Sequence, residues 1–391
     1  MRRVAVEFDF DKTIVREGTS AVKFDGRKEY FGTSDVTPLW VADMDFAVPP
    51  CVHRALMQRM EHPVLGYTLY PNSLYESIVD WFQYRHAWKI EREWILMAPG
   101  VVPSLFAAVR AFTQEGEGVI VQPPVYFPFF SSVTTANRRL MLNPLRLVDG
   151  KYAMDVAQLE SCAKQGAKLL LLCTPHNPVG RVWSESELQE ILRITRQYNV
   201  TILSDDIHAD LTYSEVTHTM LGRLANADDK IITAIAPNKT FNIPGLGLSA
   251  LIIPNHEQRR AVKREFDALH VSNTNPFSIV AFEAAYRDGA AWLNALMNYL
   301  QDTRDFAAQY IAQYIPRIKL IKPEATYLLW LDCRELGMTD LELRHFFVST
   351  CKLGMNPGAM FGEGGSGFMR MNIGVRKTVI EAALSAIAKN L

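Results

Sequence analysis

Residues 168–205 read KLLLLCTPHNPVGRVWSESELQEILRITRQYNVTILSD, and this stretch decides the fold. It opens with an apolar run short enough for a buried strand, passes a turn with two prolines, and closes with a second apolar run at 201–203. Between the runs, Ser184 and Glu187 have the spacing of a capping box, so we expect a helix to begin there and to end at Asn199. Strand, helix and strand in this order predict part of a parallel sheet.

The same rhythm extends to both sides of this stretch. Short apolar runs alternate with helical patterns from about residue 95 to about residue 255, with further strands expected at 119–121 and 231–235. Such alternation is typical of α/β proteins. We therefore predict a mainly parallel sheet with helices on both faces, in a large domain over residues 46–285.

The chain changes character after about residue 285. A long helical stretch near 291–314 is followed by strand-like runs near 327–331 and 368–372. Two domains suit a chain of 391 residues, since a domain commonly has about 150 residues. We predict that residues 1–45 and 286–391 together form a smaller domain.

Charge and cysteine content exclude several classes of function. The 41 basic and 42 acidic residues nearly cancel, so no strong field would attract nucleic acid or an anionic membrane surface. The five cysteines are scattered without a C-x-x-C pair or zinc spacing, which indicates reduced thiols. No apolar run reaches the roughly 18 residues of a membrane span, and acidic residues interrupt the amino terminus where a signal peptide would need an apolar stretch. We expect a cytoplasmic protein without a metal site.

Three polar side chains follow three of the expected strands. Asn177, Asp205 and Lys239 each come just after a buried run, and open α/β sheets bind ligands at the carboxyl ends of their strands. Phe241 and Ile243 lie close to the lysine in sequence and could desolvate it, which would lower its pKa and free the amine for Schiff-base chemistry. A single lysine in a sequence is usually a surface residue. The interpretation of Lys239 as a reactive amine therefore depends on its expected place beside Asn177 and Asp205.

The neighbours of Lys239 suit a pyridoxal ring. A buried carboxylate such as Asp205 could keep a ring nitrogen protonated, as an electron sink requires. His208 and Asn177 could both reach the ring's phenolic oxygen. The simpler readings are a helix cap for Asp205, a core histidine for His208 and a bare turn for Asn177.

A phosphate group would need a cradle, and residues 98–104 offer one. Pro103 suits the first turn of a helix through 105–112, which would place the amides of Val101 and Val102 at a helix amino terminus that can bind an anion. Tyr126 could stack on the ring, although an aromatic residue after prolines is more often part of the packing.

Together these segments resemble the fold type I pyridoxal-phosphate enzymes, the aspartate aminotransferase superfamily. The resemblance implies an α/β large domain with a mainly parallel seven-stranded sheet and a smaller α+β domain. It also implies that Lys239 carries pyridoxal 5'-phosphate as a Schiff base, that Asp205 pairs with the ring nitrogen, and that Asn177 contacts the phenolic oxygen. By the same resemblance Tyr126 stacks on the ring and Arg370 grips the substrate α-carboxylate, for which its planar fork is suited.

A closer resemblance is to the cystathionine β-lyase or carbon–sulfur lyase branch. Residues 38–46, PLWVADMDF, look like a signature of that branch, and they place Trp40 and Asp43 among the expected substrate contacts. The branch has a tyrosine, matched by Tyr67, that reaches the cofactor phosphate and the substrate of the neighbouring subunit, which implies a homodimer. Many aminotransferases have a phosphate-binding arginine where this chain has Gly247.

The sequence departs from the family just before the lysine. Serines that usually bind phosphate are replaced by Ala236, Pro237 and Asn238. Asn238 could still donate a hydrogen bond, whereas Ala236 cannot. Either the cofactor binds more weakly or its phosphate relies on Thr240 and backbone amides.

The implied reaction is β-elimination from cystathionine or related S-substituted cysteines, which gives pyruvate, ammonia and a thiol. An aminotransferase of class I or II, acting on an amino acid and a keto acid, would use the same residues. Residues 4–13 imitate the D-x-D-x-T loop of haloacid dehalogenase-type phosphatases, a third reading that the later α/β pattern disfavours. A non-catalytic protein that regulates a partner also fits.

Overall fold

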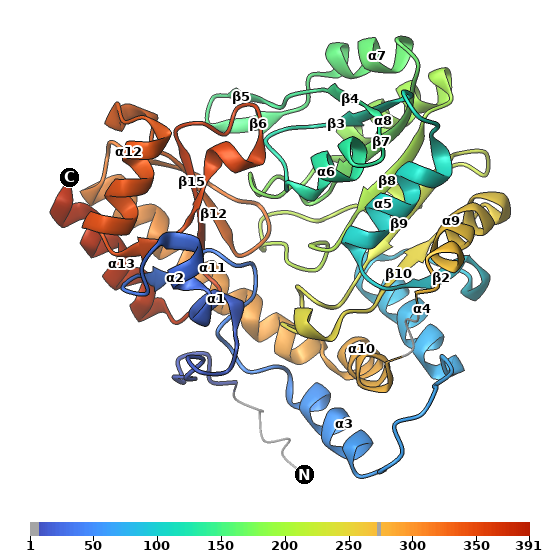
Figure 1. Cartoon of the computed structure of the whole chain (residues 1–391), viewed down its shortest axis with the longest axis horizontal. Coiled ribbons are helices and arrows are strands. Elements are labelled where there is room, and N and C mark those ends of the chain that lie inside the picture. The colour runs from blue at the N-terminus through green and yellow to red at the C-terminus, as the bar shows by residue number, and fades with distance from the viewer. Residues whose placement is uncertain (1–7, 272–274) are drawn as a thin grey trace.

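The computed structural model describes residues 8–271 and 275–391, and its largest sheet is made from the short apolar runs (Figure 1). Six of the seven strands run in the same direction. The seventh, β10, lies antiparallel to both of its neighbours, β2 and β9. The mainly parallel seven-stranded sheet implied by the resemblance is thus confirmed. In spatial order the strands are β2 (Ile95–Ala98), β10 (Ser249–Ile252), β9 (Ile231–Ile235), β8 (Thr201–Asp205), β7 (Ala167–Cys173), β3 (Gly118–Val121) and β4 (Arg139–Leu142).

Helices cover both faces of this sheet. Alternate side chains of a strand point to opposite sides, so each strand contributes to the apolar packing on both faces. On β7, Leu169 and Leu171 pack into one apolar cluster with two helices near residues 101–112 and 256–268, whereas Leu170 and Leu172 pack into another with the helices near residues 156–164 and 185–198. The sheet is therefore the middle of three layers. The helices are α5 (Val101–Phe112), α9 (His256–Ala268), α7 (Val156–Lys164) and α8 (Glu185–Tyr198).

Helix α8 begins and ends where the sequence predicts. The Ser184 hydroxyl accepts a hydrogen bond from the Glu187 amide at 3.3 Å, and the Glu187 carboxylate accepts one from the Ser184 amide at 2.7 Å. Asn199 ends the helix in the left-handed conformation with φ of 56°. The next strand, β8, runs two residues further than expected and ends on Asp205 itself.

The carboxyl-terminal part of the chain adds a second sheet, which lies beside the long helix α11 in Figure 1. Its strands are all antiparallel, in the order β11 (Lys319–Ile321), β12 (Leu328–Asp332), β15 (Phe368–Asn372) and β14 (Asn356–Pro357). The early strand β1 (Thr37–Pro38) pairs with β13 (Leu353–Gly354), so residues from both ends of the chain meet here. The division into domains at residues 46 and 286 stays a prediction.

The remaining elements surround these two sheets. They are α1 (Val22–Asp25), α2 (Arg27–Phe31), α3 (Pro50–Met60), α4 (Asn72–His86), α6 (Pro128–Thr134), α10 (Pro276–Asp288), α11 (Ala290–Tyr314), α12 (Asp340–His345), α13 (Lys377–Asn390) and the hairpin of β5 (Arg146–Val148) and β6 (Lys151–Ala153). Among the described residues, no helix has the length and apolar character needed to cross a bilayer.

Candidate active site

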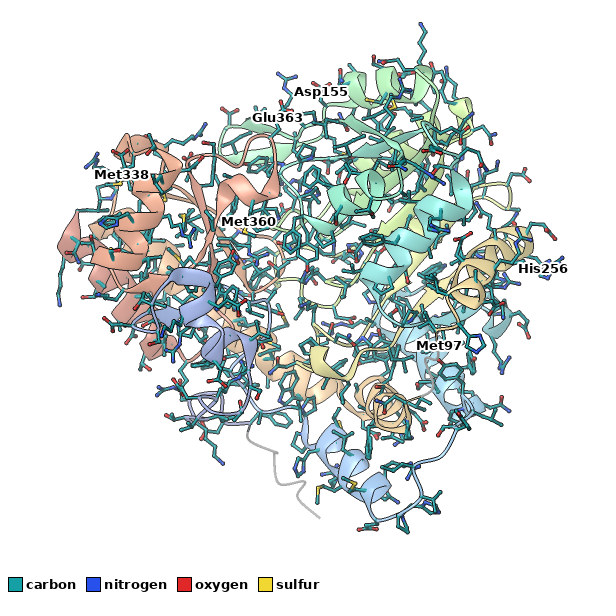
Figure 2. All side chains as sticks on the ribbon, viewed as in Figure 1. Met97, Asp155, His256, Met338, Met360 and Glu363 are labelled. Carbon is teal, nitrogen blue, oxygen red and sulfur yellow. The ribbon has the colours of Figure 1, made fainter. Side chains whose placement is uncertain are left out.

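A cavity of about 460 Å³ lies at the carboxyl edge of the seven-stranded sheet. One wall comes from the strand ends and the start of α5, and the other comes from the early loops and the second sheet. Met360, labelled in Figure 2, belongs to the second wall. The polar side chains in the lining are Tyr30, Tyr126, Cys173, Asn177, Asp205, His208, Asn238, Lys239, Asn356 and Arg370.

The structure brings Asn177, Asp205 and Lys239 to this one cavity. They follow β7, β8 and β9, which are neighbours in the sheet, so the ends of these strands lie side by side. The turn after β7 is also tied to β8, because the Thr174 amide donates to the Asp205 carbonyl at 3.0 Å. Adjacent parallel strands therefore place residues together that are up to 62 positions apart, from Asn177 to Lys239.

Asp205 is a buried carboxylate with few partners to stabilise its negative charge. Its Oδ1 accepts a hydrogen bond from the Ile207 amide at 3.1 Å. Burial raises its pKa to about 7, an effect that this amide opposes. A cation brought against the carboxylate would restore its charged form, so the site suits a protonated ring nitrogen.

Lys239 reaches across the cavity to the amino-terminal part of the chain. Its Nζ donates to the Ala42 carbonyl at 2.7 Å, and the Tyr327 hydroxyl donates to the same carbonyl at 2.8 Å. Burial, together with the positive charge of Arg370, lowers the pKa of the lysine to about 8. A substantial fraction of the amine is then neutral near physiological pH, as nucleophilic and base chemistry requires.

Two asparagines fix the segment 41–46 that presents the Ala42 carbonyl. Asn242, three residues after the lysine, donates from Nδ2 to the carbonyls of Met44 and Phe46 at 2.9 and 2.8 Å. Asn372 donates from Nδ2 to two further carbonyls of the segment, at 2.6 and 2.7 Å. The segment is held from the lysine loop and from β15 at once, so the acceptor for Lys239 is rigidly placed.

Trp40, which directly precedes this segment, and Asp43 within it have different positions. Trp40 lines the cavity, and its carbonyl accepts from Arg370 at 3.1 Å. The Asp43 carboxylate does not line the cavity: Arg16 binds it with two hydrogen bonds of 2.7 and 3.0 Å, and Lys23 lies 3.8 Å away. The Asp43 oxygens thus serve an ion-pair cluster, and the substrate contact expected of Asp43 stays a prediction.

The expected anion cradle lies at the start of α5. Val101 and Val102 are the first two residues of this helix and line the cavity, so their amides belong to the free end of the helix. Asn238 lines the same region, and its buried Oδ1 has no hydrogen-bond partner. The Thr240 hydroxyl donates to the buried Asp210 at 3.2 Å and is not among the lining residues, so a phosphate contact from it stays a prediction.

His208 also faces the cavity with an unsatisfied atom. Its buried Nδ1 has no hydrogen-bond partner, and burial with the nearby charges of Lys239 and Arg370 lowers its pKa to about 3. The ring is therefore neutral and can exchange a hydrogen bond with a ligand oxygen. Tyr126 lines the cavity as well, where its ring is available for stacking.

Arg370 projects from β15 and is 5% exposed. Its guanidinium donates to Asn177 Oδ1 at 3.0 Å, Asn356 Oδ1 at 2.8 Å and the Trp40 carbonyl, and its buried Nε has no partner. All of these acceptors are neutral, and burial lowers the pKa of the arginine to about 10. An arginine buried without an anion is well suited to take a carboxylate from a ligand.

Several residues of the site have no signal in the sequence. Tyr30, Asn356 and Met360 line the cavity, and Tyr327 donates to the carbonyl that Lys239 also binds, yet no spacing or motif of the chain marks any of the four. They reach the site only through the pairing of the second sheet and the docking of the early loops against it.

Two expected features lie away from the cavity. Tyr67 is fully exposed in an irregular segment and does not line the cavity of its own chain. Of the phosphatase-like segment, residues 4–7 lie outside the described part, and Asp9 and Asp11 are exposed surface residues, with Asp11 accepting a hydrogen bond from Tyr299 at 2.5 Å. The described residues contain no group of three or more His, Cys, Asp or Glu side chains that could hold a metal ion.

This arrangement, with a lysine, a carboxylate and an arginine at the edge of an α/β sheet, defines a class that comparison with known proteins identifies. A family model described as aminotransferase class I and II matches residues 34–387, so the chain belongs to this family. The resemblance to fold type I pyridoxal-phosphate enzymes is thereby confirmed.

Particular relatives place the chain in the carbon–sulfur lyase branch. Cystathionine beta-lyase PatB of Bacillus subtilis (strain 168) is 39% identical over 381 residues, covering 97% of this chain and 98% of that protein. Cystalysin from Treponema denticola, whose structure contains a pyridoxal 5'-phosphate cofactor, is 35% identical with a TM-score of 0.95 and 98% of each chain covered. The PLP-bound C-S lyase from Staphylococcus hominis is 31% identical with a TM-score of 0.92 and 99% of each chain covered.

Proposed function

We propose that the chain is a pyridoxal-phosphate-dependent carbon–sulfur β-lyase that acts on S-substituted cysteines, cystathionine among them. The observation that carries the proposal is a single cavity in which a lysine of lowered pKa and a buried carboxylate face an arginine with only neutral partners. The relatives named above support the same reading, since two of them are described as lyases.

The residues present fit the cofactor. Two buried nitrogens in the lining, His208 Nδ1 and Arg370 Nε, lack partners, and ligand oxygens would satisfy them. The Asn238 side chain, whose Oδ1 also has no partner, would bind a phosphate by donating from its Nδ2. Asp205 would hold the ring nitrogen, Lys239 would bind the ring covalently, and Tyr126 would stack on it. The amides of Val101 and Val102 would hold the phosphate. The missing serines then leave the helix amino terminus as its main anchor.

When bound, pyridoxal phosphate supplies an electron sink for negative charge that develops at the substrate α-carbon. Arg370 binds the α-carboxylate through charge-assisted hydrogen bonds from its guanidinium and so orients the amino acid. Lys239, whose lowered pKa makes its neutral amine more accessible near neutral pH, takes the α-proton. The thiolate then departs from the β-carbon. Water hydrolyses the three-carbon unsaturated amine that is left, which gives pyruvate and ammonia.

The Ala42 carbonyl positions the amine of Lys239 for this proton transfer. Both Lys239 and Tyr327 donate to it, and two asparagines hold its segment in place. A protonated amine binds such a carbonyl more strongly than a neutral one, because a charge-assisted hydrogen bond is stronger. The carbonyl therefore stabilises the lysine after it has taken the proton.

The same proposal includes a cytoplasmic homodimer with shared active sites. Residues 63–69 form an irregular segment with exposed apolar side chains, among them Leu69 at 87% and the fully exposed Tyr67. An exposed apolar patch of this kind is typical of a protein interface. The five cysteines are all unpaired, which suits a reducing compartment.

The central test replaces the lysine. Lys239→Ala should abolish thiol and pyruvate release from L-cystathionine and S-alkyl cysteines, and should remove the visible absorbance of the lysine–cofactor linkage. Lys12→Ala, at an exposed position, is the matched control and should keep both.

Full turnover by Lys239→Ala would contradict the proposal. Wild-type protein that releases no pyruvate unless a keto acid is added would contradict the lyase and support the aminotransferase reading instead.

A further inference from the structure

Asp210 is a buried carboxylate to which the proposed function gives no role. It follows β8, which ends at Asp205, and it is 5% exposed and not among the residues that line the cavity. Burial opposes its ionisation, whereas the hydrogen bond from His86 favours it and holds the pKa of Asp210 below its ordinary value. The carboxylate is therefore charged near neutral pH, and its two oxygens can accept from several donors at once.

The donors to Asp210 come from two different parts of the chain. Its Oδ1 lies 2.9 Å from His86 Nε2 and accepts from Trp81 Nε1 at 3.1 Å, and both of these residues belong to α4. Its Oδ2 accepts from the Thr240 hydroxyl at 3.2 Å. All four side chains are buried, so these contacts form inside one chain and do not depend on how two chains associate. One carboxylate thus joins a helix to the residue that directly follows Lys239.

Lys239 lies in a turn that two hydrogen bonds between main-chain groups close. The Phe241 amide donates to the Pro237 carbonyl at 2.8 Å, and the Ile243 amide donates to the Asn238 carbonyl at 3.0 Å. These bonds set the shape of the turn, but they do not set its position relative to the sheet and the helices. That position depends on side chains of the turn that bind residues outside it.

Thr240 and Asn242 attach the turn on two sides. Asn242 binds the segment 41–46, whereas Thr240 binds Asp210. Thr240 is the immediate neighbour of Lys239, so a shift of its side chain moves the lysine backbone as well. A reacting group that is misplaced by about 1 Å can react slower by about 10².

We infer that Asp210 is a positioning residue that, through Thr240, holds the amine of Lys239 where it can bind the cofactor. The inference rests on the proposed function, in which Lys239 binds the cofactor covalently. A threonine hydroxyl has a single proton to donate, and that of Thr240 is directed at Asp210. Contact of Thr240 with the cofactor phosphate, which only accepts hydrogen bonds, would require this bond to break.

The first experiment separates the two roles of Thr240 with pyridoxal, which lacks the phosphate. It measures the rate constant with which cofactor-free protein and pyridoxal form the visible linkage. Thr240→Val keeps the size of the side chain but removes the donor, and should lower this rate constant by about tenfold or more. Thr240→Ser keeps the hydroxyl and should restore most of the rate.

The same measurement with pyridoxal 5'-phosphate gives the contrary outcome a clear form. If Thr240→Val matched the wild-type rate constant with pyridoxal and fell below it only with the phosphorylated compound, Thr240 would act on the phosphate and the inference would be overturned.

Thr195→Val is the matched control for the loss of a buried hydroxyl bond. Thr195 is 6% exposed on α8, and its hydroxyl donates to the Ile191 carbonyl at 2.9 Å. This variant should keep the wild-type rate constant with pyridoxal even where its thermal stability falls. An equal loss of rate in Thr195→Val and Thr240→Val would show a general loss of stability and would overturn the inference.

A double-mutant cycle then tests whether Thr240 acts through Asp210. Asp210→Ala should lower the rate constant with pyridoxal by about tenfold or more, and adding Thr240→Val should lower it little further, because both changes break the same bond. Two effects that multiply to about a hundredfold would overturn the inference. If Asp210→Ala does not fold, the Thr240 variants decide alone. None of these measurements needs turnover, so a failure of the lyase proposal, seen as absent pyruvate release, is distinguished from a failure of this inference.

Discussion

Two buried arginines of this chain have opposite surroundings. Arg181 is 7% exposed, and its guanidinium pairs with Glu187 at 2.6 and 2.8 Å and with Glu324 at 2.7 Å. It lines a cavity of about 560 Å³ near the β5–β6 hairpin. Arg370 is 5% exposed and lines the cavity at the sheet edge, yet its partners are two asparagine oxygens and a carbonyl.

The difference lies in the charge balance and not in burial. In the cavity beside Arg181, the positive charges of the lining are already balanced by carboxylates. Lys151 pairs with Glu324 at 2.7 Å, just as Arg181 pairs with Glu187 and Glu324. In the cavity at the sheet edge, no carboxylate balances the charge of Arg370, so an anionic group of a ligand can pair with it. The partner set of a buried charge thus separates a structural ion pair from a binding group, and a cavity's size does not.

Removing the paired arginine should have the largest effect on stability. Arg181→Met leaves two carboxylates without their main partner and is expected to cost about 3–5 kcal/mol of unfolding free energy, as for other broken buried pairs. Urea unfolding measures it, with Arg193→Met, at an exposed pair, as the control expected to change by less than about 1 kcal/mol. An equal loss in both variants would remove the distinction drawn here.

Removing the unpaired arginine should affect activity instead. Arg370→Met is expected to lower kcat/KM by about 10²–10³, since it deletes a charge-assisted contact to the substrate carboxylate. Its unfolding free energy should fall by less than that of Arg181→Met, because the partners it leaves are neutral oxygens and no buried carboxylate loses a partner. If this variant kept the wild-type kcat/KM, or lost as much stability as Arg181→Met, Arg370 would have a structural role like that of Arg181 and would not be a binding group.

The pH dependence of the cofactor-free protein sharpens the comparison most finely. The folded-state pKa of Asp205, about 7, lies above its ordinary value, so folding favours the protonated acid. Stability should fall as pH rises from about 4 to about 7, by about 1–3 kcal/mol because solvent in the cavity offsets part of the burial.

The paired carboxylate should behave in the opposite sense. Ion pairing with Lys151 and Arg181 holds the pKa of Glu324 below its ordinary value despite the cost of burial, so its contribution is present above about pH 4.5 and is lost as pH falls. Thermal unfolding across this range, with Asp205→Asn as the control that loses the first effect, measures both. A wild-type profile identical to that of Asp205→Asn would refute the assignment.

Local patterns predict the sheet and its helices well. Ser184 and Glu187 mark the start of α8, and Asn199 marks its end, because capping hydrogen bonds and the left-handed conformation depend on a few adjacent residues. The strand ends at Asn177, Asp205 and Lys239 could be placed together for a similar reason, as parallel neighbours share one edge.

The second wall of the cavity could not be predicted in this way. Asn356 and Tyr327 reach the site only because β14 and β12 pair with β15 across large gaps in sequence. Asp43 was expected in the cavity because it lies in a signature segment, but the fold gives its carboxylate to Arg16 and Lys23. Sequence distance carries no information about such contacts.

The sequence predicted the α/β architecture and the placement of Lys239 and Asp205 at strand ends, because hydrophobic period, caps and motif order are properties of neighbouring residues, whereas Arg370 was indicated by the family resemblance. The tertiary structure alone decided how their charges are balanced. Whether a buried cation meets a carboxylate, as Arg181 does, or only neutral oxygens, as Arg370 does, depends on which distant strands and loops pack against it. That balance is set by three-dimensional contact, and the reactivity of the site follows from it.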